Sequence, residues 1–357
     1  MRLLIAGGGT GGHLYPGVAV AEELLRREGH KVLFAGSAKG IEARVLPKLG
    51  FDFSPVRCGA LVGRGLTSQA GALLTTLLGI RDSFSLISSF KPDACLGVGG
   101  YASFPVVVAA ALKGIHTAIE EQNATPGLAN KVLARLAKRI YASDEVAARA
   151  FPPAKTLICG TPIRTCFAEP FPYEPPQASK PTRVLVLGGS QGASSLNRLV
   201  PTALSMVTEP LQIRHQAGRG KEGEVRPGYA GKEGVAVEAF IDDMTAAYSW
   251  AQVVIARAGA LTLAELAAAG RPAILIPFPH AAGNHQEANA RAHEAKGAGV
   301  CILERELTAQ GLARLVASWI ENPALPTGHA EKAAAAARCE AAKVIVDDLL
   351  IQSGVLK

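Results

Sequence analysis

The sequence predicts an α/β protein of two similar domains, each with a mostly parallel sheet covered by helices on both faces. Over residues 1–165, short apolar runs alternate with segments of helical spacing, as in sheets built from strand–helix–strand units. The order strand, glycine-rich loop, helix occurs at residue 2 and again at residue 183. Between them, residues 167–182 contain five prolines and no periodicity, which is typical of a linker.

The first domain is expected to span residues 1–165. It opens with a strand at 2–6, a glycine-rich loop at 7–12 and a helix at 18–27. Further short apolar runs predict strands at 31–35, 94–98, 116–119 and 139–142.

After a linker at 166–182, the second domain is expected to span residues 183–330. Its predicted strands lie at 183–187, 253–256 and 273–276, with a glycine-rich loop at 188–193. The C-terminal segment, 331–357, contains a predicted alanine-rich helix at 331–351. We expect this helix to pack back on the first domain.

Composition restricts the class of protein. The apolar content of 48% is that of a globular chain, and the net charge of +7 favours anionic partners. Nucleic acid is disfavoured because basic runs interleaved with aromatic residues are missing. Six scattered cysteines without a CxxC pair indicate a reducing compartment and no zinc site. No apolar run is long enough for a signal-peptide core or a membrane span, so we expect a cytosolic, peripheral protein without a metal or cofactor.

The segment 257–265 is the strongest candidate for a binding site. A turn of small residues precedes a helix expected to start near Leu261 or Thr262, and a helix N-terminus binds phosphate. Glu265, which we place in the first helical turn, can accept hydrogen bonds from a ribose diol. The alternative is that Glu265 only stabilises the helix start.

The two glycine-rich loops have alternative interpretations. Gly7, Gly9 and Gly12 match GxGxxG, but no acidic residue follows the strand 31–35, which disfavours a nicotinamide cofactor. Ser190 lies in a GxSxG pattern that suits a hydrolase nucleophile. Because the first domain opens with the same architecture without a serine, a phosphate-binding loop explains both occurrences. Ser190 is then a donor to phosphate.

Several polar residues follow predicted strands, where open α/β sheets bind ligands. His13 closes the first glycine-rich loop and is either a general base or a histidine that only fixes the loop. Gln122 and Asn123 suit a neutral sugar, and Arg164 suits a diphosphate. Gln286 follows the last predicted strand and suits sugar hydroxyls. Asp242 and Asp243 are expected to cap a helix.

The stretch 61–90 is apolar nearly all round and has basic neighbours. It predicts either an ordinary core helix or a helix that docks on an anionic membrane. The membrane-facing candidates are Leu73, Leu74, Leu77, Leu78, Phe84 and Arg81.

Seven ordered motifs, spread over both predicted domains, resemble those of the MurG family. They are GGGTGGH (7–13), GVGGY (97–101), EEQNATPG (120–127), GGSQGA (188–193), FIDDM (240–244), RAGALTLAELAAAG (257–270) and HQEANA (285–290). The family is that of the bacterial transferase that adds N-acetylglucosamine to the lipid-linked muramoyl-pentapeptide. The resemblance implies a GT-B arrangement, with two facing Rossmann-like domains and a deep inter-domain cleft.

The resemblance also implies roles for matching residues. UDP-N-acetylglucosamine (UDP-GlcNAc) would be bound by Thr10, Gly11, Gly12, Asn123, Arg164, Ser190, Ile241, Ala260, Leu261, Thr262, Leu263, Ala264, Glu265 and Gln286. Glu265 would position the donor, and His13 would be the candidate base. Thr161 stands where the family usually has Asn, and Gly283 and Asn284 stand where acidic residues are common. These departures weaken the assignment of individual contacts and leave the family resemblance intact.

The implied activity is inverting transfer of N-acetylglucosamine to the 4-hydroxyl of undecaprenyl-pyrophosphoryl-MurNAc-pentapeptide in peptidoglycan synthesis. The implied partners are these two substrates, an anionic membrane surface and other cell-wall synthesis proteins, and the implied location is the cytoplasmic face of the inner membrane. The alternatives are a diacylglycerol glycosyltransferase, a UDP-GlcNAc epimerase and a non-catalytic membrane scaffold.

Overall fold

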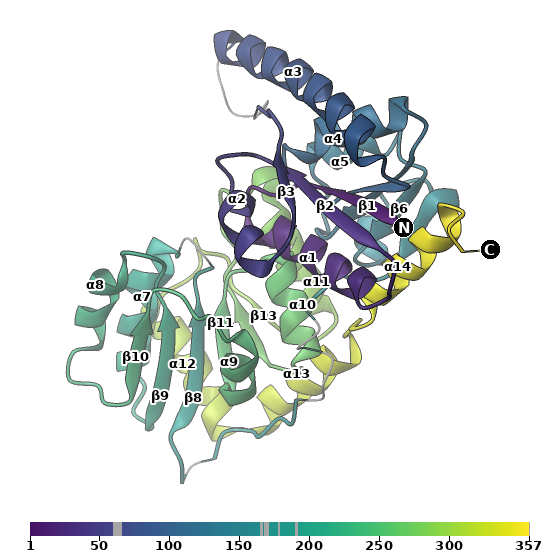
Figure 1. The fold of residues 1–357 in the computed structure, drawn as a ribbon. Coiled ribbons are helices and arrows are strands. Elements are labelled where there is room, and N and C mark those ends of the chain that lie inside the picture. Colours follow the sequence, from purple (N-terminus) through teal and green to yellow (C-terminus); the bar gives the residue numbers. More distant parts are fainter. Residues whose placement is uncertain (60–65, 165–166, 168–170, 178, 190–191, 357) are drawn as a thin grey trace. The chain divides into compact units, whose positions relative to one another are not determined.

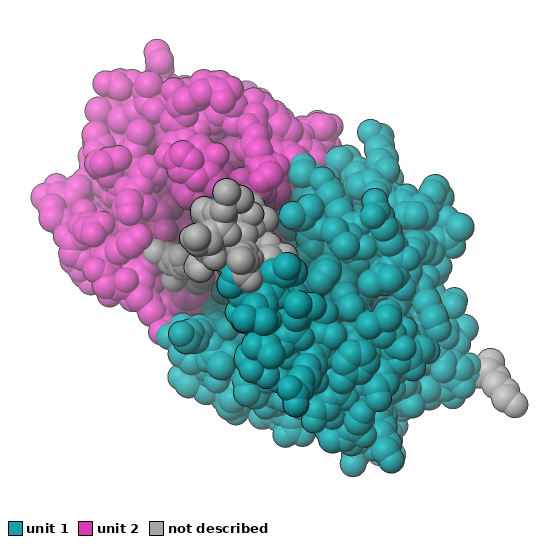
Figure 2. Space-filling view, turned by 90° about the horizontal axis from the view of Figure 1, so that it is seen from above, with its two compact units in different colours: residues 1–165, 339–357 teal, residues 166–338 magenta. Residues whose placement is uncertain are grey.

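The computed structural model describes residues 1–356 except 60–65, 165–166, 168–170, 178 and 190–191; the side chains of 66–70 and 72 are also not described. The chain forms two compact units. Unit 1 comprises residues 1–165 and 339–357, and unit 2 comprises residues 166–338 (Figure 2). Each unit is described by itself below.

Unit 1 contains a seven-stranded sheet in the order β3-β2-β1-β4-β5-β6-β7, in which every neighbouring pair is parallel. The strands are β1 (Arg2–Ala6), β2 (Lys31–Gly36), β3 (Phe53–Pro55), β4 (Ala94–Gly97), β5 (His116–Glu121), β6 (Arg139–Ala142) and β7 (Thr156–Ile158). The strand order reverses at β1, so that ligand-binding loops are expected at the carboxyl ends of β1 and β4.

Helices cover both faces of this sheet (Figure 1). They are α1 (Gly11–Leu25), α2 (Glu42–Val45), α3 (Leu66–Phe90), α4 (Ser103–Leu112), α5 (Leu128–Leu133), α6 (Glu145–Ala148) and α14 (Ala341–Gln352). Alternate residues of β1 enter separate cores: Leu3 and Ile5 pack with α1 and α14, whereas Leu4 packs with α3 and α4. Helix α1 starts at Gly11, not at residue 18 as expected, so the end of the glycine-rich motif is helical.

Unit 2 contains a six-stranded parallel sheet in the order β10-β9-β8-β11-β12-β13. The strands are β8 (Thr182–Leu187), β9 (Leu211–Gln216), β10 (Val235–Glu238), β11 (Val253–Ala256), β12 (Ala273–Leu275) and β13 (Gly299–Cys301). The helices are α7 (Ser194–Ser205), α8 (Glu222–Val225), α9 (Met244–Trp250), α10 (Ala260–Ala268), α11 (His285–Ala295), α12 (Ala309–Glu321) and α13 (Ala324–Ala335). The two parallel sheets confirm the predicted α/β fold of two Rossmann-like domains.

The C-terminal segment differs from the single helix expected at 331–351. Two helices, α13 and α14, are separated at 336–340. Helix α13 packs on α10 and β13 in unit 2, whereas α14 packs on α1 in unit 1. Asp348 fastens α14, because its Oδ2 accepts hydrogen bonds from Arg139 Nε and Tyr141 Oη, both at 2.8 Å. The break allows the apolar side of each helix to be buried in a different unit.

Candidate active site

The first glycine-rich loop of unit 1 packs backbone against backbone on the loop that follows β4. The Gly8 N–H donates to the Gly99 carbonyl oxygen at 3.3 Å. A Cβ on Gly7 would lie 2.5 Å from the Gly99 oxygen, and a Cβ on Gly100 would lie 2.3 Å from the Gly8 oxygen. Both residues also have positive φ. Any side chain at these positions would therefore separate the two loops.

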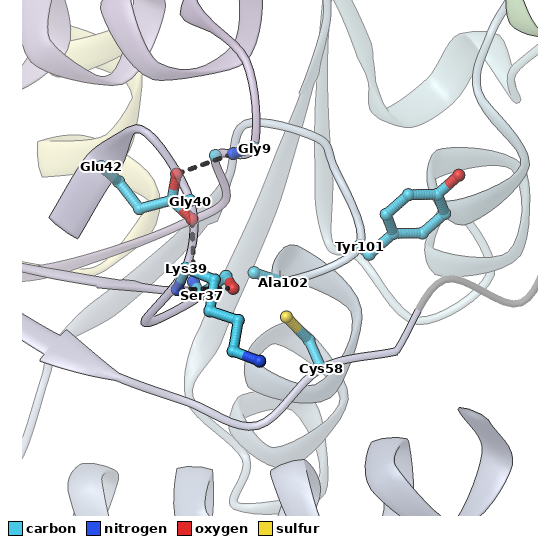
Figure 3. A pocket seen from close by; sticks show the side chains of 9 residues that line it. Gly9, Ser37, Lys39, Gly40, Glu42, Cys58, Tyr101 and Ala102 are labelled. Atoms are coloured by element: carbon cyan, nitrogen blue, oxygen red, sulfur yellow. Dashed lines mark hydrogen bonds between the residues drawn. The ribbon is translucent and has the colours of Figure 1, made fainter. Parts of the chain in front are cut away.

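A buried carboxylate, Glu42, holds the same loop from the other side. Its Oε2 accepts a hydrogen bond from Gly9 N and its Oε1 accepts one from Ser37 N, both at 2.8 Å (Figure 3). The side chain lines a pocket of about 280 Å³ that also contacts Lys39, Cys58 and Tyr101. Glu42 was not among the predicted site residues, because an isolated glutamate at the start of a short helix carries no recognisable pattern.

The N-terminus of α1 brings together the first four predicted site residues. Thr10 is the N-cap, with an extended backbone, and Gly11, Gly12 and His13 form the first helical turn. The dipole of this 15-residue helix favours a negatively charged group at its N-terminus. The structure therefore places His13 beside a position suited to an anion.

Gln122, which was expected to contact a sugar, reaches His13 in the structure. Its Nε2 lies 3.1 Å from the Gly12 carbonyl oxygen and 2.5 Å from His13 Nδ1. The imidazole also packs closely on Gly99, since a Cβ there would lie 2.6 Å from Nδ1. His13 is thus held by contacts from the ends of two strands, β4 and β5.

Asn123 is oriented by the buried carboxylate of Glu121. Glu121 Oε1 accepts from Asn123 N at 3.0 Å and from Asn123 Nδ2 at 3.2 Å. Its Oε2 accepts from Gly127 N at 3.0 Å and from Asn130 Nδ2 at 2.9 Å. Burial raises the pKa of Glu121 and these hydrogen bonds oppose the rise. Glu121 is therefore a structural residue that shapes the loop carrying Asn123.

The carboxyl group of the neighbouring Glu120 is buried without the hydrogen bonds that Glu121 accepts. Glu120 is 1% exposed, and neither carboxylate oxygen has a hydrogen-bond partner in the described structure. Burial, followed by repulsion from Glu121, raises the pKa of Glu120 well above its usual value. Between the normal glutamate pKa and this raised value, the folded protein holds a proton that the unfolded chain has lost. Stability must therefore fall as the pH rises through this range.

We expect Glu120→Gln to stabilise the protein at neutral pH, because the amide removes a group that is costly to ionise. The stability gain over wild type should be small near pH 4.5 and should grow at higher pH by at most about 1.4 kcal/mol per pH unit. Urea-unfolding midpoints between pH 5 and 8 measure this. Glu121→Gln is the matched control and should destabilise, because its carboxylate accepts four hydrogen bonds. A gain from Glu120→Gln that is independent of pH would contradict the prediction.

Arg164 follows β7 in unit 1. Its guanidinium carbon lies 5.3 Å from the centre of the Tyr15 ring, a cation–π distance. It also lowers the pKa of Glu22, although burial of Glu22 has the larger, opposite effect. These contacts place Arg164 next to the first helix of unit 1, on the same unit as His13.

In unit 2, Arg257 connects the carboxyl ends of two strands with the start of α7. Its Nη1 donates to the Ile276 and Pro277 carbonyl oxygens at 3.0 and 3.1 Å. Its Nη2 donates to Ser195 Oγ at 2.7 Å and lies 2.6 Å from Glu304 Oε2. The sequence motif contained Arg257 without a role, and the structure identifies it as the residue that fixes the turn before α10.

The position of Glu265 corrects the sequence analysis. Helix α10 starts at Ala260, after the N-cap Gly259, so Glu265 is its sixth residue and lies in the second turn. Its side chain is buried and its Oε2 accepts a hydrogen bond from Tyr248 Oη at 3.2 Å. The alternative interpretation, in which Glu265 only stabilises the start of the helix, is therefore wrong. Residues Ala260 to Ala264, predicted to bind UDP-GlcNAc, are half-buried.

Gln216 links two further predicted residues. Ser190 lies outside the described residues, but the adjacent Gly189 carbonyl accepts from Gln216 Nε2 at 3.0 Å. Gln216 Oε1 accepts from Ile241 N at 3.2 Å. The N–H of Ile241 is thus engaged in a hydrogen bond within the protein. Elsewhere in unit 2, Gln286 Oε1 accepts from Phe278 N at 2.9 Å.

Among the described residues, no three His, Cys, Asp or Glu side chains are grouped so as to hold a metal ion. Asp243 caps α9 by accepting a hydrogen bond from Ala246 N at 2.9 Å. The predicted capping role is confirmed for this residue.

Comparison with known proteins decides the family. The models of the glycosyltransferase family 28 N-terminal and C-terminal domains match residues 3–142 and 183–347. A relative from Geobacter metallireducens is 44% identical over 98% of either chain. It is named UDP-N-acetylglucosamine–N-acetylmuramyl-(pentapeptide) pyrophosphoryl-undecaprenol N-acetylglucosamine transferase. A relative of the same name from Myxococcus xanthus is 44% identical, covering 99% of this chain and 94% of its own.

The chain belongs to the MurG family.

A solved structure agrees with this assignment. The crystal structure of Acinetobacter baumannii MurG is 32% identical and superposes with a TM-score of 0.80, covering 98% of this chain and 99% of that one. The two Rossmann-like domains expected from the resemblance are therefore confirmed for this MurG-family chain.

The apolar patch predicted for this MurG-family chain is narrower than expected. Leu73, Leu74 and Leu77 of α3 are 55–60% exposed, and Arg81 is exposed. Leu78 and Phe84 are half-buried, and Phe84 packs against the core beside α4. In Figure 1 the first turns of α3 extend beyond α4, which explains why Leu73, Leu74 and Leu77 are exposed.

No helix in the described part of the chain has the length and apolar character needed to cross a bilayer.

Proposed function

We propose that this protein transfers N-acetylglucosamine from UDP-GlcNAc to the 4-hydroxyl of undecaprenyl-pyrophosphoryl-MurNAc-pentapeptide, with inversion at the anomeric carbon. The observation that carries this proposal is the 44% identity, over nearly the whole chain, to transferases named for this reaction. Both halves of the chain match family 28 glycosyltransferase domains, so the enzyme class is a hexosyltransferase.

Unit 2 is proposed to bind the nucleotide. The turn before α10 and residues 260–264 would bind the diphosphate and nucleoside, with Glu265 accepting from the ribose hydroxyls and the Ile241 backbone reading uracil. The α10 N-terminus favours negative charge, which supports this assignment. Ser190 would hold the diphosphate, and Gln286 would contact the sugar.

Unit 1 is proposed to bind the acceptor at its glycine-rich loops. Thr10, Gly11, Gly12 and Asn123 would contact the transferred sugar beside His13. The acceptor oxygen forms a bond to the anomeric carbon as the bond from that carbon to the UDP oxygen breaks. UDP leaves with the electron pair, and the hydroxyl proton passes to a base. Preorganised N–H donors and Arg164 would stabilise the charge that develops on UDP.

The reaction is tested by measuring UDP release from UDP-GlcNAc with and without a short-chain analogue of the lipid-linked acceptor. The expected result is release that requires the acceptor, together with a disaccharide product. Release without acceptor would indicate a hydrolase or a hydrolysing epimerase and would overturn the proposal. If the protein binds UDP but releases none from UDP-GlcNAc in either reaction, the proposed nucleotide site stands and the proposed acceptor is wrong.

We further propose that unit 1 docks on the cytoplasmic face of the cell membrane through the start of α3. Three exposed leucines beside Arg81 combine apolar area with positive charge, as in helices that lie in anionic interfaces. Exposed apolar side chains on α5, Leu128 and Val132, flank the exposed Lys131. The lipid-linked acceptor would then be reached at the membrane surface.

Replacing Leu73, Leu74 and Leu77 together by serine should weaken binding to anionic vesicles at least about tenfold, since each leucine loses apolar burial in the bilayer. Co-sedimentation with vesicles containing phosphatidylglycerol measures this. Leu325→Ser is the control, because Leu325 is similarly exposed but lies in unit 2. Equal binding of the triple variant and wild type would refute docking through α3.

A further inference from the structure

The amide of Gln122 has an orientation that the backbone determines. One and the same atom of this side chain lies 3.1 Å from the Gly12 carbonyl oxygen and 2.5 Å from His13 Nδ1. A carbonyl oxygen can only accept a hydrogen bond, so this atom must be the amide nitrogen. The contact with Gly12 thereby removes the usual ambiguity between the two ends of a glutamine amide.

The orientation of the amide decides which nitrogen of His13 carries the hydrogen. An amide nitrogen only donates, so Nδ1 must present its lone pair to Gln122, and a neutral imidazole then has its hydrogen on Nε2. Protonation of Nδ1 would direct its N–H against that of the amide. We propose that Gln122 is a positioning residue that holds His13 in the Nε2–H tautomer, so that the ring donates a hydrogen bond to a charged substrate oxygen instead of acting as the general base.

The surroundings of the ring support a single orientation. Gly99 packs against Nδ1 and Cε1, where a Cβ would approach to 2.6 and 2.9 Å. A rotation of the ring by 180° would exchange Nδ1 for a carbon atom and lose the hydrogen bond to Gln122. The close contact and the hydrogen bond together therefore hold Nδ1 toward Gln122.

A donor at Nε2 fits the chemistry of the α1 N-terminus. The first turn of this helix presents backbone N–H groups, and a neutral His13 in this tautomer adds another donor to them. Such a set stabilises an oxygen that bears negative charge, such as a diphosphate oxygen of either substrate. The catalytic consequence rests on the proposed transferase function, whereas the tautomer is a property of the protein without substrate.

The tautomer is measured directly by long-range ¹H–¹⁵N NMR of the wild-type protein labelled with ¹⁵N-histidine, at a pH where His13 is neutral. The His13→Gln variant assigns the signals. We expect His13 to show a protonated Nε2 and an unprotonated Nδ1. A His13 ring with its hydrogen on Nδ1 would overturn the proposal, whether or not the protein has transferase activity.

Two variants test the consequence for catalysis. Gln122→Glu places a hydrogen-bond acceptor beside Nδ1 and should move the hydrogen there, lowering kcat roughly a hundredfold, as loss of one preorganised donor does. Gln122→Met removes the preference for the Nε2–H tautomer without favouring the other tautomer. Its decrease in kcat should therefore be smaller than that of Gln122→Glu. Each variant's NMR spectrum reports the tautomer, and affinity for UDP separates donor from acceptor effects.

Gln212→Glu is the control for the added negative charge. Gln212 is exposed on β9 in unit 2, so this variant should retain wild-type kcat. If His13 were the base through Nε2, Gln122→Glu would keep or raise kcat, and that result would overturn the proposal. If wild type transfers no sugar, the proposed function fails, and the tautomer is still decided by NMR.

Discussion

Glu265→Ala is expected to weaken the affinity for UDP about a hundredfold. The buried carboxylate is proposed to accept hydrogen bonds from both ribose hydroxyls, and a hydrogen bond to a charged group contributes about 1.5–3 kcal/mol. Loss of about 3 kcal/mol corresponds to this change in Kd. Isothermal titration calorimetry with UDP measures it, and the effect on kcat at saturating donor should be smaller.

The control separates binding from packing. Tyr248→Phe removes the hydroxyl that donates to Glu265 Oε2 and leaves the carboxylate in place, so its UDP affinity should stay within a few fold of wild type. A Glu265→Ala variant that binds UDP normally would show that the carboxylate has only a structural role. Thermal unfolding of both variants confirms that the unit remains folded.

Glu42→Gln is expected to destabilise the protein by about 2–3 kcal/mol. The carboxylate of Glu42 accepts Gly9 N and Ser37 N on separate oxygens. A glutamine must turn its NH₂ group toward one of these N–H groups, which leaves buried donors unpaired and costs about 1–3 kcal/mol for each group. Urea unfolding followed by circular dichroism measures the loss.

Turnover should fall in the same variant, because Gly9 lies directly before Thr10, the N-cap of the helix that carries His13. Glu340→Gln provides the matched control: this glutamate is 74% exposed and pairs with Lys343 on the surface, where an ion pair contributes less than about 1 kcal/mol. If both variants lost similarly little stability, Glu42 would not be the residue that holds the glycine-rich loop.

The local pattern of the sequence was sufficient for the fold class. Apolar runs such as 2–6 and 183–187 are strands buried on both faces, and burial of whole strands requires continuous apolar residues. The glycine-rich motifs could be recognised in the sequence because the backbones of two loops approach each other closely there, which excludes side chains. Short strands such as β3 and β13 were missed, since three residues show no periodicity.

The tertiary structure decided how the site residues act. Glu42 contacts Gly9 across 33 positions of sequence, and Gln122 reaches His13 across 109; no local pattern encodes such pairings. Likewise, the opposite environments of Glu120 and Glu121 depend on which face of β5 each occupies and on which donors lie there. The sequence alone determined the family and the two parallel sheets. Hydrogen-bond partners, the tautomer of His13 and the ionisation of Glu120 follow only from the folded chain, because they depend on distances between residues far apart in the sequence.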